Sequence, residues 1–374
     1  MTILTNARIV LADRIVHGSI TMSAGVIGIV EEGLSRVGVD CEGDYVLPGI
    51  VDLHTDNLER QVLPRSNARW PSRSALLAHD SQCAAAGVTT VFDALCLGDI
   101  GFEKARNQTF EDGMADLRAL AGTDLLKSDH FLHLRCELPA AEMPGMLDRA
   151  IDNPLVRLIS LMDHSPGGGQ YADVEKYRRM RRAEGFGDDE ITTMIDFLER
   201  SRATHALPNR AYVLERARAT AVPIASHDDR TEAEVVQNHQ DHIAIAEFPV
   251  THAAARAAHD HGITTIAGAP NIVRGGSHSG NVGALELIRA GLVDALASDY
   301  VPAAMMEAAF ACAAGGAATL PQAIALISAG PADMVGLADR GRISPGLRAD
   351  LVRVRMHDEL PVIRAVWRQG ERVA

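Results

Sequence analysis

Eight short apolar runs, each followed by polar residues, constrain the fold of this chain more than any other feature of its sequence. The stretches between them are helix-forming, as SALLAHDSQCAAAG and THAAARAAHDHG illustrate. Strands that alternate with helices indicate repeated βα units and a parallel sheet. Eight such units predict a closed (β/α)8 barrel of the TIM type, although periodicity alone does not exclude an open sheet. The runs are GIVDLH (49–54), TTVFDA (89–94), HFLHLRCE (130–137), VRLISLMDH (156–164), VPIASHDD (222–229), IAIAEFP (243–249), TTIAGAPN (264–271) and DALASDY (294–300).

Both ends of the chain have a different pattern, in which apolar and polar residues alternate between glycine and proline. The N-terminal part contains ILTNARIVL and GSITMSAGVIGIV, and the C-terminal part contains GRISPGLRADLVRVRM and PVIRAVWRQGERV. Such segments are typical of short strands. We therefore expect residues 1–48 together with 341–374 to form a β-sandwich accessory domain, and residues 49–340 to form the barrel. A chain of 374 residues has room for both.

The connection between the fourth and fifth runs, residues 171–221, is too long for an ordinary loop. Its apolar spacing and charge density predict two or three amphipathic helices. The plain interpretation is a solvated helical insertion or an oligomer contact. The alternative is a lid that brings basic residues toward an anionic substrate, namely Lys176, Arg178, Arg179, Arg181 and Arg182.

Composition narrows the class of partner. The net charge of −13 argues against nucleic acid and anionic membranes, so an anionic substrate would need a local group of cations. The five cysteines are odd in number and lack CxxC spacing, which favours a reducing compartment. The sequence shows neither a signal-peptide pattern nor a run of about 18 apolar residues. We expect a cytoplasmic enzyme that acts on a small molecule, with a homo-oligomer left open.

Nitrogen and oxygen ligands for a metal follow several of the predicted strands. His54 and Asp56 end the first run and are two positions apart, so both should point to the same side. The C-terminal ends of barrel strands meet at one mouth, where active sites of this fold lie. A capped turn or a core histidine would explain one of these residues but not the set. The predicted metal ligands are His54, Asp56, Glu137, His227 and Asp299.

The ligand types indicate the chemistry. Imidazoles and carboxylates together suit zinc, manganese or iron rather than calcium, and we expect one or two ions, zinc first among them. Two such ions could share Glu137 and activate a water between them. Asp299 would be the catalytic residue, holding that water and accepting its proton as general base. The sequence therefore predicts metal-assisted hydrolysis.

The motifs around these residues resemble those of the amidohydrolase superfamily over nearly the whole chain. VLPGIVDLHTD, GVTTVFDA, SHDD, ASDY and a closing G-x-I-x-x-G-x-x-ADLV carry this resemblance. HTDNLE, HLRCE, LMDHSPG, AEFP and GAPN-x-x-RG-x-SHSGN are similar, more narrowly, to the phosphonate-utilisation branch. The resemblance implies cleavage of α-D-ribose 1-methylphosphonate 5-triphosphate to the 5-phosphate and pyrophosphate.

The sequence departs from the common superfamily pattern at three strands. The first strand offers Asp56 where the pattern has a second histidine, and the fourth ends without a lysine. The sixth ends in Glu247 where a histidine is expected, so Glu247 either replaces that ligand or orders its neighbours. The possible ligands or supporting groups are His164, Asp163, Glu247 and Asp228.

Arginine-bearing loops follow the first and seventh strands. NLERQVLPRSNARW supplies three arginines, and GAPNIVRGGSHSGN supplies one together with several glycines. Arginine pairs bidentately with phosphate, and glycines let backbone N–H groups approach it, although flexible glycine loops also occur without a ligand. The predicted substrate-binding residues are Arg65, Arg135, Asn271, Arg274, Ser277 and His278.

Two other functions compete with phosphoanhydride hydrolysis. Amide or cyclic-amide hydrolysis and deamination are the commoner reactions of this superfamily, but their substrates need fewer cations. A non-catalytic barrel that has lost its metal would have no reason to keep five ligand residues at one mouth. We therefore expect a diphosphatase.

Overall fold

The computed structural model describes the chain except for residues 34, 66–67, 101–104 and 277–280. One of its two sheets has eight parallel strands in chain order, and every predicted apolar run overlaps one of them. The (β/α)8 prediction is thereby confirmed. The strands are β6 (Ile50–Thr55), β7 (Val88–Leu97), β8 (Asp129–Glu137), β9 (Val156–Met162), β10 (Ile224–His227), β11 (Ile245–Glu247), β12 (Thr264–Gly268) and β13 (Ala295–Ala297).

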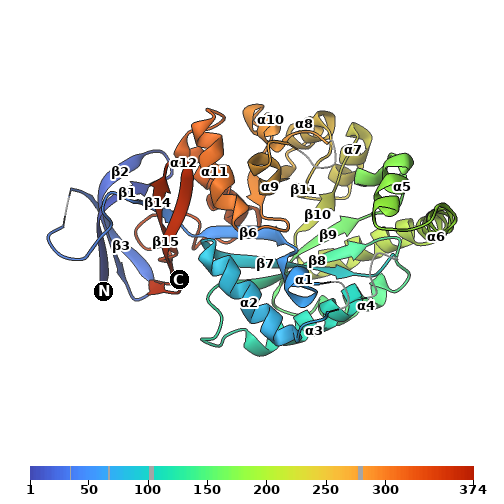
Figure 1. The fold of residues 1–374 in the computed structure, drawn as a ribbon, viewed down its shortest axis with the longest axis horizontal. Helices are drawn as coiled ribbons and strands as arrows, with labels where there is room; N and C mark the ends of the chain where they lie inside the picture. The colour runs from blue at the N-terminus through green and yellow to red at the C-terminus, as the bar shows by residue number, and fades with distance from the viewer. Residues whose placement is uncertain (34, 66–67, 101–104, 277–280) are drawn as a thin grey trace.

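Helices surround this sheet (Figure 1). Most connect one strand to the next, and α11 to α13 follow the last strand. They are α1 (Asn57–Val62), α2 (Ser72–Ala85), α3 (Ala105–Leu120), α4 (Met143–Ala150), α5 (Val174–Ala183), α6 (Asp188–Thr220), α7 (Glu232–Gln240), α8 (His252–Asp260), α9 (Ala269–Val273), α10 (Ala284–Arg289), α11 (Ala304–Ala314), α12 (Leu320–Ala325) and α13 (Ala329–Met334). None of the helices in the described ranges is long and apolar enough to cross a membrane.

The barrel closes where its last strand meets its first. The backbone N–H of Asp299 donates to the carbonyl of His54 at 3.0 Å, and the N–H of Asp56 donates to the carbonyl of Asp299 at 2.6 Å. Thr55 and Asp299 form a parallel bridge between them. The C-terminal ends of strands one and eight are therefore held side by side.

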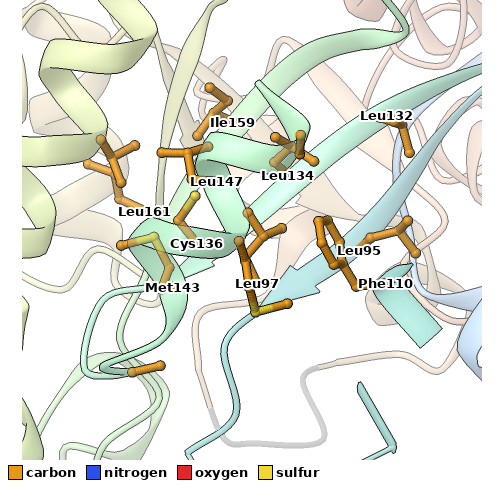
Figure 2. Close-up of a cluster of buried hydrophobic side chains, with 14 of the residues drawn as sticks. Leu95, Leu97, Phe110, Leu132, Leu134, Cys136, Met143, Leu147, Ile159 and Leu161 are labelled. Carbon is orange, nitrogen blue, oxygen red and sulfur yellow. The ribbon is translucent and has the colours of Figure 1, made fainter. Parts of the chain in front are cut away.

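Side chains alternate in direction along each strand, and this alternation separates the apolar core from the polar mouth of the barrel. On β8, Leu132, Leu134 and Cys136 are buried and belong to the cluster that packs against the surrounding helices, as Figure 2 shows. His133, Arg135 and Glu137 occupy the intervening positions and face the other side, since successive side chains of a strand point to opposite faces. A smaller apolar cluster drawn from the strands, including Leu53, Phe92, Leu158, Ile245 and Ile266, fills the barrel interior.

The second sheet joins the two ends of the chain. Strand β5 pairs with β1 in parallel and with β14 in antiparallel orientation, so N-terminal and C-terminal segments form one sheet (Figure 1). This is the β-rich domain expected from both ends; the limits 1–48 with 341–374 stay a prediction. Its strands are β1 (Thr2–Val10), β2 (Ile15–Ser23), β3 (Val26–Glu32), β4 (Val39–Asp40), β5 (Tyr45–Pro48), β14 (Leu351–His357), β15 (Leu360–Arg368) and β16 (Glu371–Arg372).

An ion cluster at the start of β8 ties the barrel to the C-terminal segment. Asp129 accepts a hydrogen bond from Arg340 at 2.7 Å and another from Arg348, and Arg368 lies 3.5 Å away. The side chains of Arg340 and Arg348 are only 7% and 11% exposed. Burial alone would raise the pKa of Asp129, but these two guanidinium groups outweigh it and lower the pKa below its usual value.

The insertion at 171–221 is helical, as expected. It contains α5 and α6, and it is preceded by a short 3-10 turn at Gly169–Tyr171. The basic residues of α5 pair with carboxylates close by in the chain: Arg181 with Glu184 at 2.8 Å, and Arg182 with Asp188 at 2.6 Å. These pairs neutralise charge that a lid over an anionic substrate would need.

Candidate active site

A cavity of about 350 Å³ opens at the C-terminal ends of the barrel strands. Nine of the residues singled out from the sequence line it, and they come from six of the eight strand ends. They are His54, Asp56, Arg135, His164, His227, Asp228, Asn271, Arg274 and Asp299. The mouth therefore gathers imidazoles, carboxylates and cations from segments far apart in the sequence.

Glu247 lies beneath two of the histidines rather than in the cavity wall. Its carboxylate is fully buried, with Oε1 3.4 Å from His54 Nδ1 and Oε2 3.2 Å from His227 Nδ1. Ser160 Oγ donates to Oε2 at 2.7 Å. Burial alone would lower the pKa of His54, but the Glu247 carboxylate and then Asp56 outweigh it and raise the pKa to about 10. This contact occupies Nδ1 of each ring and leaves Nε2 for another partner.

Glu137 makes the same kind of contact with His164. Its Oε2 lies 2.6 Å from His164 Nδ1, and its Oε1 accepts the backbone N–H of His164 at 2.9 Å. Both carboxylate oxygens therefore face one residue. The role of Glu137 as a ligand shared by two ions stays a prediction, and this geometry favours a role in orienting His164.

Asp56 is held between a histidine and an arginine. Its Oδ1 is 3.6 Å from His54 Nε2 and 2.5 Å from Arg135 Nη1. Burial alone would raise the pKa of Asp56, but the Arg135 guanidinium and then His54 outweigh it and keep the carboxylate ionised. Arg135 is only 6% exposed at its side chain, so its charge is directed to Asp56.

Asp299 follows β13 with a backbone φ of 56°, in the left-handed region. Asp228 and Phe248, which follow strands five and six, have φ values of 56° and 52°. Non-glycine residues rarely adopt this conformation, and such strain clusters at functional sites. Burial, and next the Asp56 carboxylate, raise the pKa of Asp299 to about 6.

The donor set fits a divalent metal. Two overlapping groups, His54–His227–Glu247 and His164–His227–Asp228, each have one ligand atom per residue, all within 4.8 Å of one another. Imidazole and carboxylate donors suit zinc, manganese or iron. Histidines that bind metal commonly donate their other N–H to a carboxylate, as Glu137 and Glu247 would allow here.

Some predicted residues lie elsewhere. Arg65 is exposed and is not among the residues that line the cavity. Asp163 pairs with Arg202 of α6, with its Oδ2 2.6 Å from the arginine Nε. Ser277 and His278 lie outside the described residues.

The sequence interpretation missed several residues of the cavity wall. The short 3-10 turn that leads into the insertion supplies Gln170 and Tyr171, none of the insertion's arginines lines the cavity, and Tyr300 directly follows Asp299. Position next to a known strand end could have suggested Tyr300. Arg106 comes from the start of α3, which follows the second strand. No spacing in the sequence marks it.

A second buried polar cluster lies between α2 and the barrel wall. Asp93 has Oδ1 2.7 Å from His79 Nε2 and Oδ2 2.8 Å from His130 Nδ1, and Asp80 Oδ1 is 3.2 Å from His130 Nε2. Burial alone would lower the pKa of His130, but Asp93 and then Asp80 raise it to about 10. Asn57, the residue after Asp56, donates its amide to His79 Nδ1 at 2.9 Å. The cluster therefore reaches the edge of the active site.

Comparison with known proteins identifies relatives. No family model matches the chain. An α-D-ribose 1-methylphosphonate 5-triphosphate diphosphatase from Escherichia coli (strain K12) is 41% identical over 376 residues, which cover 99% of this chain and 100% of the relative. A sequence this similar over the full length shares fold and family.

Solved structures agree with the fold. The 5-methylcytosine deaminase of Klebsiella pneumoniae superposes with a TM-score of 0.63 at 14% identity, covering 100% of this chain and 98% of its own. The N-acetyl-D-glucosamine-6-phosphate deacetylase of Mycobacterium smegmatis gives 0.63 at 15%, with 100% of both chains covered. The dihydropyrimidinase of Brevibacillus agri gives 0.65 at 13%, covering 99% and 94%. These likenesses bear on the fold alone.

Proposed function

The chain belongs to the family of α-D-ribose 1-methylphosphonate 5-triphosphate diphosphatases, and from that membership we propose that it hydrolyses such a ribose 5-triphosphate to the 5-phosphate and pyrophosphate. The reaction adds one water across the Pα–O–Pβ linkage: one P–O bond forms, one breaks, and the released proton goes to a base. The resemblance inferred from the sequence motifs is confirmed by the relative. The chain is accordingly a hydrolase on an amidohydrolase-type barrel.

We infer that the metal is held by groups that reach the cavity, and that zinc is the ion. When bound, it supplies positive charge at the phosphoanhydride and lowers the pKa of a nearby water. Glu247 and Glu137 support the imidazoles from behind, at the Nδ1 contacts measured above. The proposed ligands are His54, Asp56, His164, His227, Asp228 and Asp299. For Glu137, which the sequence motifs predict as a ligand, the contact with His164 supports an orienting role.

Asp299 is the proposed general base. Burial and the Asp56 carboxylate raise the pKa of Asp299 above its usual value, the direction that favours a proton acceptor. Its backbone is fixed by hydrogen bonds to His54 and Asp56 on the first strand, so the carboxylate is positioned before substrate binds. Asn271 and Arg274 are proposed substrate contacts, since both line the cavity.

One observation supports this function most: the candidate metal ligands and two further arginines line the same cavity. Arg106 and Arg274 share the wall with His54, His227 and Asp299. Arginines pair bidentately with phosphate oxygens, and an amide substrate would give them no partner. A small anionic phosphorylated substrate, a cytoplasmic location and the absence of nucleic-acid or membrane partners belong to the same proposal.

The test measures products rather than turnover alone. Metal-loaded protein is incubated with ribose and nucleoside 5-triphosphates and, separately, with a cyclic amide and an N-acetyl sugar, and pyrophosphate and orthophosphate are quantified individually. We expect pyrophosphate from the triphosphates and no turnover of the amides. Amide turnover without pyrophosphate release would restore the amide-hydrolase alternative.

A further inference from the structure

Two arginines line the cavity without a hydrogen bond to a proposed metal ligand among the described residues. Of the three arginines among the described residues that line it, Arg135 has its Nη1 on Asp56 at 2.5 Å. The other two are Arg106 and Arg274. The residues around these two arginines differ. This difference indicates which end of an elongated substrate with an anion at each end would bind to which arginine.

Arg106 is the partly buried cation. Its side chain is 27% exposed, and its Nε is 3.4 Å from Glu59 Oε2. Within the described ranges this buried Nε makes no hydrogen bond, because the contact with Glu59 lacks the geometry for one. The guanidinium is also close enough to Asp56 to help hold that carboxylate ionised. A cation in this position has donors to offer a phosphate.

Arg274 is exposed at the other side of the cavity and has polar neighbours. Its Nη1 donates to the hydroxyl of Tyr300 at 3.3 Å. Asn271 and Asn281 line the same wall, so amides and a hydroxyl accompany the guanidinium there. Such groups suit the hydroxyls of a sugar next to an anion.

The order of strands places the two arginines on opposite sides of the proposed metal ligands. Arg274 follows β12 and Arg106 follows β7. Strands β13 and β6 lie between them in the closed barrel, and the ends of these two strands carry Asp299, His54 and Asp56. A substrate spanning from one arginine to the other must therefore cross the proposed metal site.

We propose that Arg106 binds the terminal phosphate of the leaving pyrophosphate and that Arg274 binds the phosphonate on C1 of the ribose. This assignment rests on the proposed function. It sets the Pα–O–Pβ linkage over the metal ligands and the ribose beside Asn271, Asn281 and Tyr300. The partly buried side holds the inorganic end, because the neighbours of Arg106 include the Glu59 carboxylate and the Arg135 guanidinium, whereas amides and a hydroxyl accompany Arg274.

The experiment crosses two substrates with four variants. The substrates are ribose 5-triphosphates with and without the 1-methylphosphonate, and the variants are R106A, R106K, R274A and R118A. Arg118 is the matched control, since it is exposed at the other end of the same helix and does not line the cavity. Steady-state kcat/KM is measured for each pair, together with the affinity of metal-loaded protein for pyrophosphate and the metal content.

R106A should lower kcat/KM about tenfold to a hundredfold on both substrates, the loss expected from one charge-assisted contact, and weaken pyrophosphate binding to a similar extent. R106K should recover part of both. R274A should lower kcat/KM by a similar factor only on the phosphonate-bearing substrate and leave pyrophosphate affinity unchanged. R118A should match the wild-type protein in all three measurements.

The assignment is overturned if R106A leaves pyrophosphate affinity unchanged, or if R274A affects both substrates equally. A reversed pattern, with R106A sensitive to the phosphonate and R274A weakening pyrophosphate binding, would overturn the orientation. A failure of the proposed function would look different, because the wild-type protein would then release no pyrophosphate from either substrate. These outcomes are distinguishable in the same data set.

Discussion

The side-chain amide of Asn57 donates a hydrogen bond to Nδ1 of His79 at 2.9 Å and so connects the active-site edge to a buried polar cluster. The same amide donates to Gln82 at 3.0 Å, so both of its hydrogens are used. Since Nδ1 of His79 accepts, its Nε2 carries the proton that is shared with Asp93 at 2.7 Å. Asn57 directly follows Asp56, and this contact therefore fixes the turn that carries a proposed metal ligand.

Replacing Asn57 by alanine should weaken metal binding as well as stability. His79 Nδ1 would keep only the weak thiol contact of Cys83 at 3.6 Å, so the loss of the amide donor should cost roughly 0.5–1.5 kcal/mol. Metal affinity from chelator competition should also fall, because the turn at Asp56 loses its anchor. Asp80→Asn is the control, since Asp80 lies at the far end of the cluster; it should lower the melting temperature and leave metal affinity unchanged. Unchanged metal affinity in N57A would reduce the contact to a purely structural one.

Asp129→Asn should destabilise the protein at neutral pH and much less in acid. The lost contacts to Arg340 and Arg348 are hydrogen bonds between charged groups, worth roughly 1.5–3 kcal/mol. The folded-state pKa of Asp129 is lowered, so its contribution is present above the unfolded value near 4 and is lost as pH falls through the folded value.

Urea unfolding of the wild-type protein and D129N at a series of pH values measures this directly. The difference in unfolding free energy between the wild-type protein and D129N should be largest at neutral pH and should become smaller below about pH 4. Asp188→Asn is the control, because its ion pair with Arg182 is exposed and screened by solvent, so its loss should change the free energy of unfolding less than the loss of Asp129 does. A gap independent of pH would show that the charge of Asp129 is not what matters.

Asp299→Asn should retain metal and lose turnover. The amide still offers an oxygen to the site but cannot accept a proton, so kcat should fall on the order of 10²-fold or more. Metal analysis and kcat on a triphosphate are measured on the same preparation. Turnover near the wild-type rate with full metal content would remove Asp299 from the proton transfer.

The sequence predicted the barrel because strand periodicity is a local property. Residues at strand ends, such as His54, His227 and Asp299, were predicted for the same reason and do line one cavity. How deep a side chain lies within the barrel is not a local property of the sequence. The motifs predict Glu137 as a metal ligand; in the structure its Oε2 lies 2.6 Å from His164 Nδ1, a contact that only tertiary packing sets.

Two features of the site could not be predicted from the sequence for a related reason. Arg106 lies beyond the loop after the second strand, where no repeating pattern fixes the direction of a side chain. The cluster of His79, Asp93 and His130 joins a helix to two strands, and its members are up to 51 residues apart in the chain. Pairing between such segments is set by the fold, not by spacing.

The most direct test of the central claim follows the phosphorus atoms of the substrate. Protein stripped of metal by a chelator, and the same protein reloaded with zinc, are each incubated with α-D-ribose 1-methylphosphonate 5-triphosphate, and products are read by phosphorus NMR. We predict one pyrophosphate and one ribose 5-phosphate product per substrate consumed, with the reloaded protein alone active. Orthophosphate as the first product, or equal turnover by the stripped protein, would contradict a metal-dependent diphosphatase.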